Sequence, residues 1–393
     1  MKYTIGIDIG TSHIKIMAMN ATGEILFKEQ LETLTTHALP NTAEQNPDIL
    51  LQQVIQLLTI VSQKMVEKPA AITFSSGMHS LMAVDTEGYP LTEVLIWADN
   101  RAEFYAQKLK NTPRGKALFQ HTGTPIHAMS PLVKIAWIRD NQPDIFKKTA
   151  WFCGIKEYIF FKLFDTRIID LSLASATGLM HTIDTIWHKP ALKYASITVK
   201  QLSKIVSPYH VETLKNNTYF PNWDDVPFVI GASDGCLSNL ASGATDAQMT
   251  TITMGTSGAV RRMYAVETTS ITREKDLKQA FLFTYRLDED HFVVGGPTNN
   301  GGIVLEWLSE NLFKQDISTI LQAAQAVEIG SNDLIFLPYI LGERAPLWDS
   351  TARGAFLNIA FAHTQAHFIR ATMEGILFNI QNIHQSIDRK SVV

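Results

Sequence analysis

The chain opens with two runs in which residue types alternate and a third run that also reads as a strand. The runs cover residues 3–10, 13–20 and 24–32, and the turn at residues 20–23 reads Asn-Ala-Thr-Gly. Alternation with a period of two predicts strands that bury one face, and Asn and Gly are typical of tight turns. We therefore expect an antiparallel β-meander at the start of the chain.

A helix and a buried strand are predicted after the meander. Asn46, Pro47 and Asp48 form a helix start, with Asn as the cap and Pro at the first helical position. Apolar residues follow at helical spacing, at Leu50, Val54, Leu57, Leu58 and Val61. Residues 70–78, AAITFSSGM, predict a short strand with a parallel neighbour. The order β-β-β-α-β is that of a ribonuclease-H-like α/β domain.

The opening pattern returns later in the chain. Residues 4–19, TIGIDIGTSHIKIMAM, resemble residues 250–265, TTITMGTSGAVRRMYA, and both predict strand, Gly-Thr-Ser turn, strand. The repeat is either a duplicated fold with two turns facing each other across a cleft, or two unrelated tight turns. A duplicated fold fits a boundary near Pro221–Val226, giving domains at residues 1–225 and 226–393.

Composition narrows the classes of partner. The 393 residues have 46% hydrophobic content, enough for a large core, and a net charge of −4 with no basic tract. Neither nucleic acid nor a membrane is therefore expected as a partner. Two cysteines, Cys153 and Cys236, fit a reduced cytosol. We find no secretion signal and no apolar run of about 18 residues, so a cytoplasmic protein is expected.

The first Gly-Thr-Ser turn suits a phosphate group. Gly10 allows close backbone approach, Thr11 and Ser12 add hydroxyl donors, and successive N–H groups form an anion nest. The spacing matches neither the GxxxxGK[ST] loop nor the GxGxxG turn. Asp8 ends a buried strand, where an unpaired carboxylate is costly, and Mg²⁺ bridged to phosphates would satisfy it. Lys15 either reaches the same phosphates or is a solvated strand residue.

A second acid follows another apolar strand. Residues 227–243, PFVIGASDGCLSNLASG, predict a strand that runs into a helix with Asp234 at the junction. The carboxyl end of a strand is where α/β folds place ligands, and a carboxylate there can orient a hydroxyl and accept its proton. Capping of the helix is the alternative role for Asp234.

Two further segments mix apolar and polar groups. SSGMHS, residues 75–80, brings Met78 and His79 after a strand, and WADNRA, residues 97–102, brings Trp97 and Asp99. Binding of a polyol or sugar acid needs such a mixture. Each residue taken singly also has an ordinary structural explanation.

Together these segments resemble the FGGY family of carbohydrate kinases, of the actin-like ATPase superfamily, over nearly the whole chain. The motifs that carry the resemblance are GIDIGTSHIK (6–15), SSGMHS (75–80), GASDG (231–235), MGTSG (254–258), GGPTNNGGIVLEW (295–307) and FLPYILGERAPLWDSTARG (336–354). Finer features, including WADNRAE and GTPIHAMSPL, look most like the branch that acts on gluconate. Xylulokinases are the runner-up.

The resemblance implies a role for each matched residue. Asp8 is the Mg²⁺-linked carboxylate, and Asp234 is the base for the acceptor hydroxyl. The sugar is faced by Met78, His79, Trp97 and Asp99. The phosphates of ATP are lined by Gly10, Thr11, Ser12, Lys15, Gly255, Thr256 and Gly302. His13 departs from the small hydroxyl residue usual in the first motif. Arg101 is a candidate for the acceptor's carboxylate, or a partner of Asp99 or Glu103.

The implied reaction is transfer of a phosphoryl group from Mg·ATP to the 6-hydroxyl of D-gluconate. A non-catalytic sugar-binding protein is an alternative from another class, and the family also suggests a homodimer. The family continues beyond Val393 with elements that hold adenosine. Residues 367–388 predict an amphipathic helix with Ile369, Met373, Ile376, Leu377, Ile380 and Ile383 on related faces. Only five residues follow this helix, so we expect its apolar surface to lack a partner, and either the true product is longer or this is a truncated or frameshifted copy.

Overall fold

The computed structural model describes residues 2–214, 220, 223–266 and 282–388. The chain forms two compact units. The first unit comprises Met1–Ala241 and Tyr285–Phe292, and the second comprises Ser242–Thr284 and Val293–Val393. Each unit is described by itself below.

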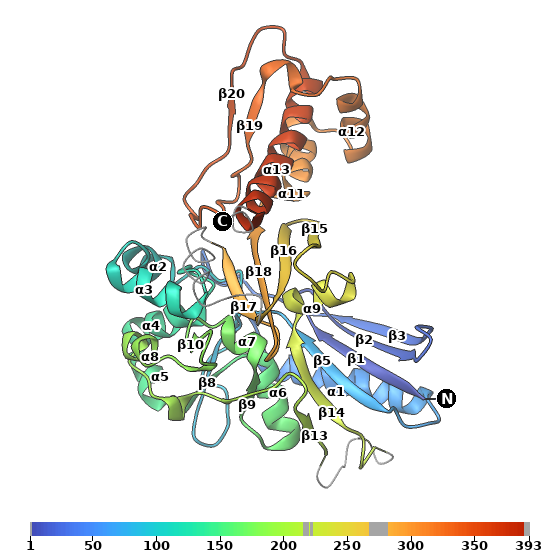
Figure 1. Cartoon of the computed structure of the whole chain (residues 1–393), viewed down its shortest axis with the longest axis vertical. Coiled ribbons are helices and arrows are strands. Elements are labelled where there is room, and N and C mark those ends of the chain that lie inside the picture. Colours follow the sequence, from blue (N-terminus) through green and yellow to red (C-terminus); the bar gives the residue numbers. More distant parts are fainter. Residues whose placement is uncertain (1, 215–219, 221–222, 267–281, 389–393) are drawn as a thin grey trace. The chain divides into compact units, whose positions relative to one another are not determined.

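The first unit is built on a six-stranded sheet in the order β13-β14-β5-β1-β2-β3 (Figure 1). Its strands are β1 (Tyr3–Ile9), β2 (His13–Asn20), β3 (Ile25–Glu32), β5 (Ala71–Ser76), β13 (Val211–Glu212) and β14 (Phe228–Ser233). The first three form the predicted antiparallel meander, and β5 is parallel to both β1 and β14. Since β1, β5 and β14 run the same way, their carboxyl ends meet at one edge of the sheet.

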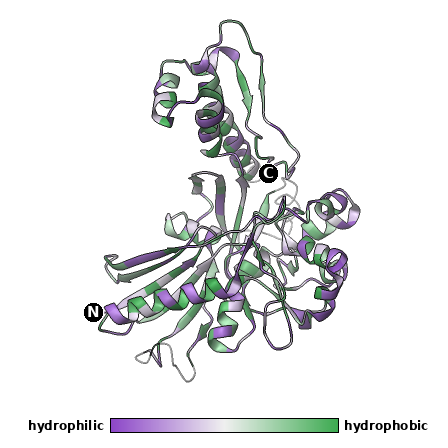
Figure 2. Cartoon of the chain, turned by 180° about the vertical axis from the view of Figure 1, so that it is seen from behind, coloured by the Kyte–Doolittle hydropathy of each residue, from purple (hydrophilic) through white to green (hydrophobic). Residues whose placement is uncertain are grey.

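Helix α1 (Pro47–Lys64) covers one face of this sheet. Asn46 caps it by accepting hydrogen bonds from the N–H groups of Asp48 at 3.1 Å and Ile49 at 3.0 Å. Figure 2 shows both hydrophilic and hydrophobic residues along the helix. Its buried side chains are those predicted, with Pro47 in addition: Leu50, Val54, Leu57, Leu58 and Val61. The predicted order β-β-β-α-β is confirmed, with the short strand β4 (Glu44–Gln45) preceding the helix.

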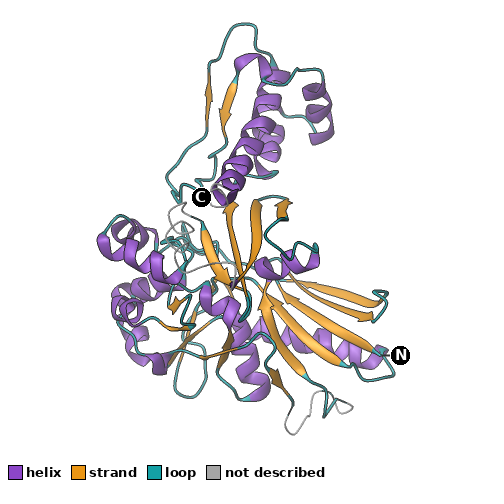
Figure 3. Ribbon diagram, viewed as in Figure 1, coloured by secondary structure: helices purple, strands orange, loops and turns teal. Residues whose placement is uncertain are grey.

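Helices and short strands make up the rest of the first unit (Figure 3). The helices are α2 (Glu103–Lys110), α3 (Pro113–Thr122), α4 (Pro131–Asn141), α5 (Pro143–Lys148), α6 (Ile155–Phe164), α7 (Leu171–Ser175), α8 (Lys189–Ala195), η1 (Val199–Gln201) and α9 (Asp234–Ala241). The short strands are β6 (Met82–Val84), β7 (Val94–Leu95), β8 (Trp151–Cys153), β9 (Ile168–Asp170), β10 (Met180–His181), β11 (Ile186–Trp187) and β12 (Lys204–Val206). Many of them enclose a second hydrophobic core, distinct from the core under the sheet.

The second unit contains the second predicted hairpin. Its main sheet has the order β15-β16-β18-β17, formed by β15 (Thr250–Met254), β16 (Gly258–Ala265), β17 (Phe283–Arg286) and β18 (His291–Thr298). Strands β17 and β18 run on into the segment Tyr285–Phe292, which belongs to the first unit. The remaining elements are α11 (Ile303–Trp307), η4 (Leu308–Phe313), α12 (Ile317–Gln325), η5 (Ser331–Asp333), β19 (Ile335–Leu337), β20 (Ala355–Leu357) and α13 (Gln365–Asp388).

The long C-terminal helix α13 has partners within the second unit, contrary to expectation. Ile369, Ile376, Ile380 and Ile383 are buried, and the helix packs against α11, α12, β16 and β19. Leu377, predicted on the apolar side, is instead 57% exposed, as is its neighbour Phe378 at 61%. The apolar stripe is therefore narrower than the predicted one.

The units divide between Ala241 and Ser242, whereas the sequence placed a boundary between residues 225 and 226. Strand β14 and helix α9 lie in that interval, and β14 pairs with β5 of the first sheet. Two residues of the expected boundary segment, Pro221 and Asn222, lie outside the described residues.

Candidate active site

The turn after β1 is held by hydrogen bonds from three segments. The Gly10 N–H donates to the His13 carbonyl at 3.1 Å. The Thr11 carbonyl accepts hydrogen bonds from Thr33 Oγ1 at 2.6 Å and Gln45 Nε2 at 2.7 Å. A β-carbon on Gly10 would lie only 2.8 Å from the His13 carbonyl oxygen, so the turn requires glycine. The first predicted phosphate motif is therefore a tightly closed hairpin.

Asp8 lies beside this turn with an incompletely satisfied carboxylate. It is half-buried, and its Oδ1 is buried with no hydrogen-bond partner among the described residues. An unpartnered buried carboxylate oxygen is costly, and Mg²⁺ prefers oxygen ligands of this kind. The residues present therefore fit a Mg²⁺ ion held through Asp8.

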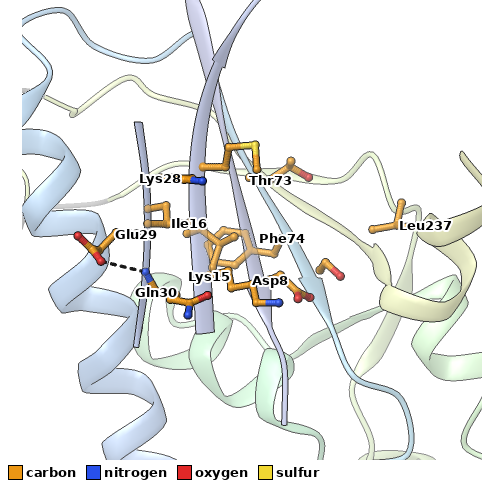
Figure 4. A pocket seen from close by; sticks show the side chains of 13 residues that line it. Asp8, Lys15, Ile16, Lys28, Glu29, Gln30, Thr73, Phe74 and Leu237 are labelled. Carbon is orange, nitrogen blue, oxygen red and sulfur yellow. Dashed lines mark hydrogen bonds between the residues drawn. The ribbon is translucent and has the colours of Figure 1, made fainter. Parts of the chain in front are cut away.

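Asp8 and Lys15 line the same cavity, of about 680 Å³. They are directly opposite in the β1–β2 pairing, and Figure 4 shows them on neighbouring strands. Strand alternation puts Asp8 on the face opposite to Ile7 and Ile9, which belong to the core under α1. Lys28 on β3 adds a second cation to the lining. Lys15 is exposed, so the alternative of a solvated strand residue stays open.

Asp234 stands at the same edge of the sheet as Asp8. Strand β14 ends at Ser233, which pairs with Ser76 of β5, and Ser76 pairs with Ile9 of β1. A β-carbon on Gly77 would lie 4.0 Å from Asp234 Oδ2 and 3.9 Å from Thr11 Cγ2. The backbone at Gly77 thus runs between the second acid and the first turn. Asp234 Oδ1 also accepts the Gly235 N–H at 2.6 Å, so the residue serves the start of α9 as well.

A buried ion pair supports the strand end before Asp234. Lys156 Nζ lies 2.8 Å from Asp170 Oδ2 and donates to the Ala232 carbonyl at 3.2 Å. The N–H of Ser233 donates to Ser172 Oγ at 2.7 Å. These contacts fix the two residues that precede Asp234, and the sequence analysis did not identify them.

The predicted sugar segment is held in an unusual backbone conformation. His79 has φ of 68°, and its Nδ1 lies 2.8 Å from the Ala176 carbonyl, so this nitrogen carries the hydrogen. The His79 ring is 5.9 Å from the ring of Tyr285. Met78 and Trp97 are half-buried, and Met78 packs against the second core. The segment is therefore anchored within the first unit.

Asp99 and Arg101 pair with each other inside the protein. Asp99 is fully buried, and Arg101 Nη2 lies 2.7 Å from its Oδ2 and 2.6 Å from Glu44 Oε1. The Ala43 N–H also donates to Asp99 Oδ2 at 2.9 Å, and the Arg101 guanidinium lies over the Trp137 ring. Contact with Asp99 and Glu44 raises the pKa of Arg101 despite burial. Both side chains are thus engaged with partners inside the protein.

The second turn and the predicted Gly302 come together within the second unit. The Gly255 N–H donates to the Ser257 carbonyl at 2.9 Å, closing the β15–β16 hairpin. The Gly302 N–H donates to the Gly255 carbonyl at 2.7 Å, and the Ile303 N–H donates to the Thr256 carbonyl at 3.2 Å. A β-carbon on Gly302 would lie 3.0 Å from that Gly255 oxygen. Three of the predicted phosphate residues are therefore neighbours.

Glu343 holds this part of the second unit together, a role that sequence reasoning missed. It is fully buried and accepts hydrogen bonds from Thr298 Oγ1 at 2.6 Å, the Asn299 N–H at 3.0 Å and Asn379 Nδ2 at 2.9 Å. Burial raises the pKa of Glu343. The signal in the sequence was the GERAP motif of residues 342–346, in which Arg344 follows Glu343. That arginine donates to the Thr298 carbonyl at 3.1 Å.

Two family models match the chain. The N-terminal domain of the FGGY family of carbohydrate kinases matches residues 3–241, and the C-terminal domain matches residues 250–392. The chain belongs to the FGGY family of carbohydrate kinases. The two matches divide the chain where its compact units divide, and the predicted two-domain, actin-like α/β fold is confirmed.

Individual FGGY proteins show the same likeness. A gluconokinase of Bacillus licheniformis is 40% identical, with 97% of this chain and 76% of the relative covered. A xylulose kinase of Bacillus subtilis is 28% identical, with 99% and 77% covered. Crystal structures of a gluconate kinase and a ligand-bound xylulose kinase, both from Lactobacillus acidophilus, are each 33% identical and give TM-scores of 0.90 and 0.91. Both solved structures cover 98% of this chain, which covers 78% of each.

Among the described residues, no helix has both the length and the apolar character needed to cross a membrane.

Proposed function

We propose that this FGGY chain transfers the terminal phosphoryl group of ATP to the 6-hydroxyl of D-gluconate. Gluconokinase relatives at 40% identity, against 28% for the xylulose kinase, support gluconate as the acceptor. Asp8 would hold Mg²⁺, which neutralises charge on the phosphates. The chain's own residues position the reactants, and positioning and charge stabilisation carry most of phosphoryl-transfer catalysis.

The placement of Asp234 carries this proposal. Its carboxylate lies at the carboxyl end of β14, close to Gly77 of the sugar segment. Gly77 in turn lies close to Thr11 of the first turn. An acid at that place can orient the acceptor hydroxyl by accepting its hydrogen bond and can take its proton as the phosphoryl group arrives. We assign Asp234 as the general base.

The phosphate contacts come from both Gly-Thr-Ser turns. In the first unit, we propose that Gly10, Thr11 and Ser12 line the phosphates and that Lys15 adds positive charge. In the second unit, the hydrogen-bonded group of Gly255, Thr256 and Gly302 does the same. Thr253 replaces the acid of the first copy, so the proposed metal ligand, Asp8, belongs to the first unit alone.

We propose that Met78, His79 and Trp97 contact the acceptor. The Nδ1 of His79 is bonded to the Ala176 carbonyl, so Nε2 is the acceptor nitrogen of the neutral ring. Asp99 stays out of this proposed site because its carboxylate is already bound by Arg101 and the Ala43 N–H. Arg101 is likewise committed to two acids, so the acceptor's carboxylate needs another partner.

Xylulose is the second candidate acceptor. The crystal structure of a xylulose kinase matches this chain as well as that of the gluconate kinase, at 33% identity each. A non-catalytic sugar-binding protein is the candidate from another class, and the placement of both acids argues against it.

The test is the variant Asp234→Asn. Turnover is expected to fall by about a hundredfold or more, because proton transfer contributes about 10² to 10⁴. The gluconate dissociation constant, measured by calorimetry, should change little, because the amide keeps the shape and a hydrogen-bonding oxygen. Turnover close to that of the unmodified chain would remove Asp234 from the mechanism.

A further inference from the structure

Lys134 is a fully buried lysine in the middle of an apolar helix. It lies on α4 between Val133 and Ile135, and its relative exposure is 0%. Its Nζ donates to three backbone carbonyls, those of His79 at 2.9 Å, Ile96 at 2.8 Å and Leu95 at 3.2 Å. The three protons of an ammonium group thus have three acceptors.

Keeping this charge inside the protein is costly. Burial is the main cause that lowers the pKa of Lys134 to about 7; Asp99 opposes this shift, and the charge of Arg101 contributes to it. An apolar side chain of similar length at this position would avoid that cost and still fill the space. Packing of α4 alone therefore does not account for a lysine here.

The acceptors of Lys134 lie on two separate segments of the proposed sugar site. One is His79 itself, next to Met78, and the others immediately precede Trp97. The backbones of these segments are also paired through Leu81 and Leu95, at 3.0 and 2.8 Å. Lys134 adds a second connection, directly at the residues proposed to contact the acceptor.

The backbone at His79 needs such support. Its φ of 68° is in the left-handed region, which a non-glycine residue adopts at a cost. The peptide is restrained by the His79 carbonyl bonded to Lys134 and by the ring bonded to Ala176. Without the ammonium group, the His79 carbonyl would lose its hydrogen bond to Lys134. Of these two restraints, only the hydrogen bond between the His79 ring and Ala176 would remain.

We propose that Lys134 is a positioning residue of the sugar site. It fixes the carbonyls of His79, Leu95 and Ile96 so that Met78, His79 and Trp97 present one preformed surface to the acceptor. This inference rests on the proposed function, because that function identifies the sugar site. The hydrogen bonds by which Lys134 connects the two segments do not depend on it.

The test compares Lys134→Met with Ile138→Ala, a control on the same helix that removes buried volume from an apolar side chain, which donates no hydrogen bond to a carbonyl. In Lys134→Met, we expect the gluconate KM to rise by about tenfold or more, because small misplacements of binding groups are costly. The KM for ATP should stay near that of the unmodified chain. Ile138→Ala should lower thermal stability while leaving the gluconate KM unchanged.

Hydrogen exchange without substrate is the second readout. Lys134→Met should speed exchange of amides in residues 77–81 and 94–98 beyond the change in Ile138→Ala. An unchanged gluconate KM, or exchange no faster than in the control, would overturn the inference. Failure of the unmodified chain to phosphorylate gluconate would instead refute the proposed function, and the exchange result would still judge the role of Lys134.

If Lys134→Met does not fold, Lys134→Gln replaces it, because the amide keeps neutral donors. Its gluconate KM should lie above that of the unmodified chain. Equality between the two would contradict the inference.

Discussion

At the scale of single residues, Asp8 gives the sharpest expectation for metal dependence. Asp8→Asn removes the negative charge of the carboxylate, whose buried Oδ1 has no hydrogen-bond partner among the described residues. The Mg²⁺ concentration for half-maximal activity should rise by at least about tenfold, because even indirect support of a metal is commonly worth that much. Titration of activity with Mg²⁺ measures the shift. Glu29→Gln, a change in the same cavity lining, is the control, and an identical response in both variants would refute the role of Asp8.

The buried carboxyl group of Glu157 is expected to make the stability of the fold depend on pH. It is buried on α6, accepts the Gly154 N–H at 2.5 Å and lies 2.5 Å from Ser203 Oγ. Burial raises the pKa of Glu157 from 4.5 to about 8. A raised folded-state pKa means that this contribution to stability is present below pH 4.5 and lost as the pH rises to about 8.

Glu157→Gln should therefore remove that dependence. Relative to the variant, the unmodified chain should lose a few kcal/mol of unfolding free energy between pH 4.5 and about 8, as followed by urea unfolding. The control is Glu24→Gln, the same substitution at an exposed residue. Parallel stability curves for Glu157→Gln and the unmodified chain would contradict the assignment.

Residue pairing is also where sequence reasoning reached its limit. Asp8, Asp234 and His79 could be proposed from the sequence because each lies at or shortly after the end of a strand, and strand ends are visible in the pattern. The pairing of Arg101 with Glu44 could not be predicted because the two residues are 57 positions apart in the chain. Lys134 was missed because its three acceptors are backbone carbonyls, which carry no sequence signal.

At the scale of elements, the second turn depends on close contact with the segment before α11. A β-carbon on Gly301 would lie 2.7 Å from the Gly255 carbonyl oxygen and 2.9 Å from the Ser257 carbonyl carbon. Gly301→Ala should therefore push the turn away and raise the KM for ATP by about tenfold. Gluconate binding, followed by calorimetry, should be unaffected. An unchanged KM for ATP would separate this turn from nucleotide binding.

Elements formed from neighbouring residues were predicted well. The meander and α1 follow from alternation, a turn and an Asn-Pro start, all of which act within a few residues. The burial of α13 was predicted less well because its partners, such as β19 and α11, are fixed by tertiary packing. Leu377 is hydrophobic yet exposed, and periodicity alone does not distinguish it from Ile376.

At the scale of the whole molecule, the chain's division was only partly predictable. The repeat of two Gly-Thr-Ser hairpins indicated duplication, and two FGGY domain matches agree with it. No sequence pattern predicts that Tyr285–Phe292 belongs to the first unit. Arg286 makes this connection with two hydrogen bonds. Its side-chain Nε donates to the Thr182 carbonyl at 3.0 Å, and its backbone N–H donates to Ser175 Oγ at 3.1 Å.

The most direct test of the proposed function is ATP-dependent phosphorylation by the whole 393-residue chain of D-gluconate, D-xylulose, glycerol and L-ribulose. The proposal predicts that kcat/KM is highest for D-gluconate and that the product carries phosphate on the 6-hydroxyl. A preference for D-xylulose would contradict the assigned acceptor. No turnover on any of the four, with gluconate still bound in calorimetry, would contradict the assignment of this chain as a kinase.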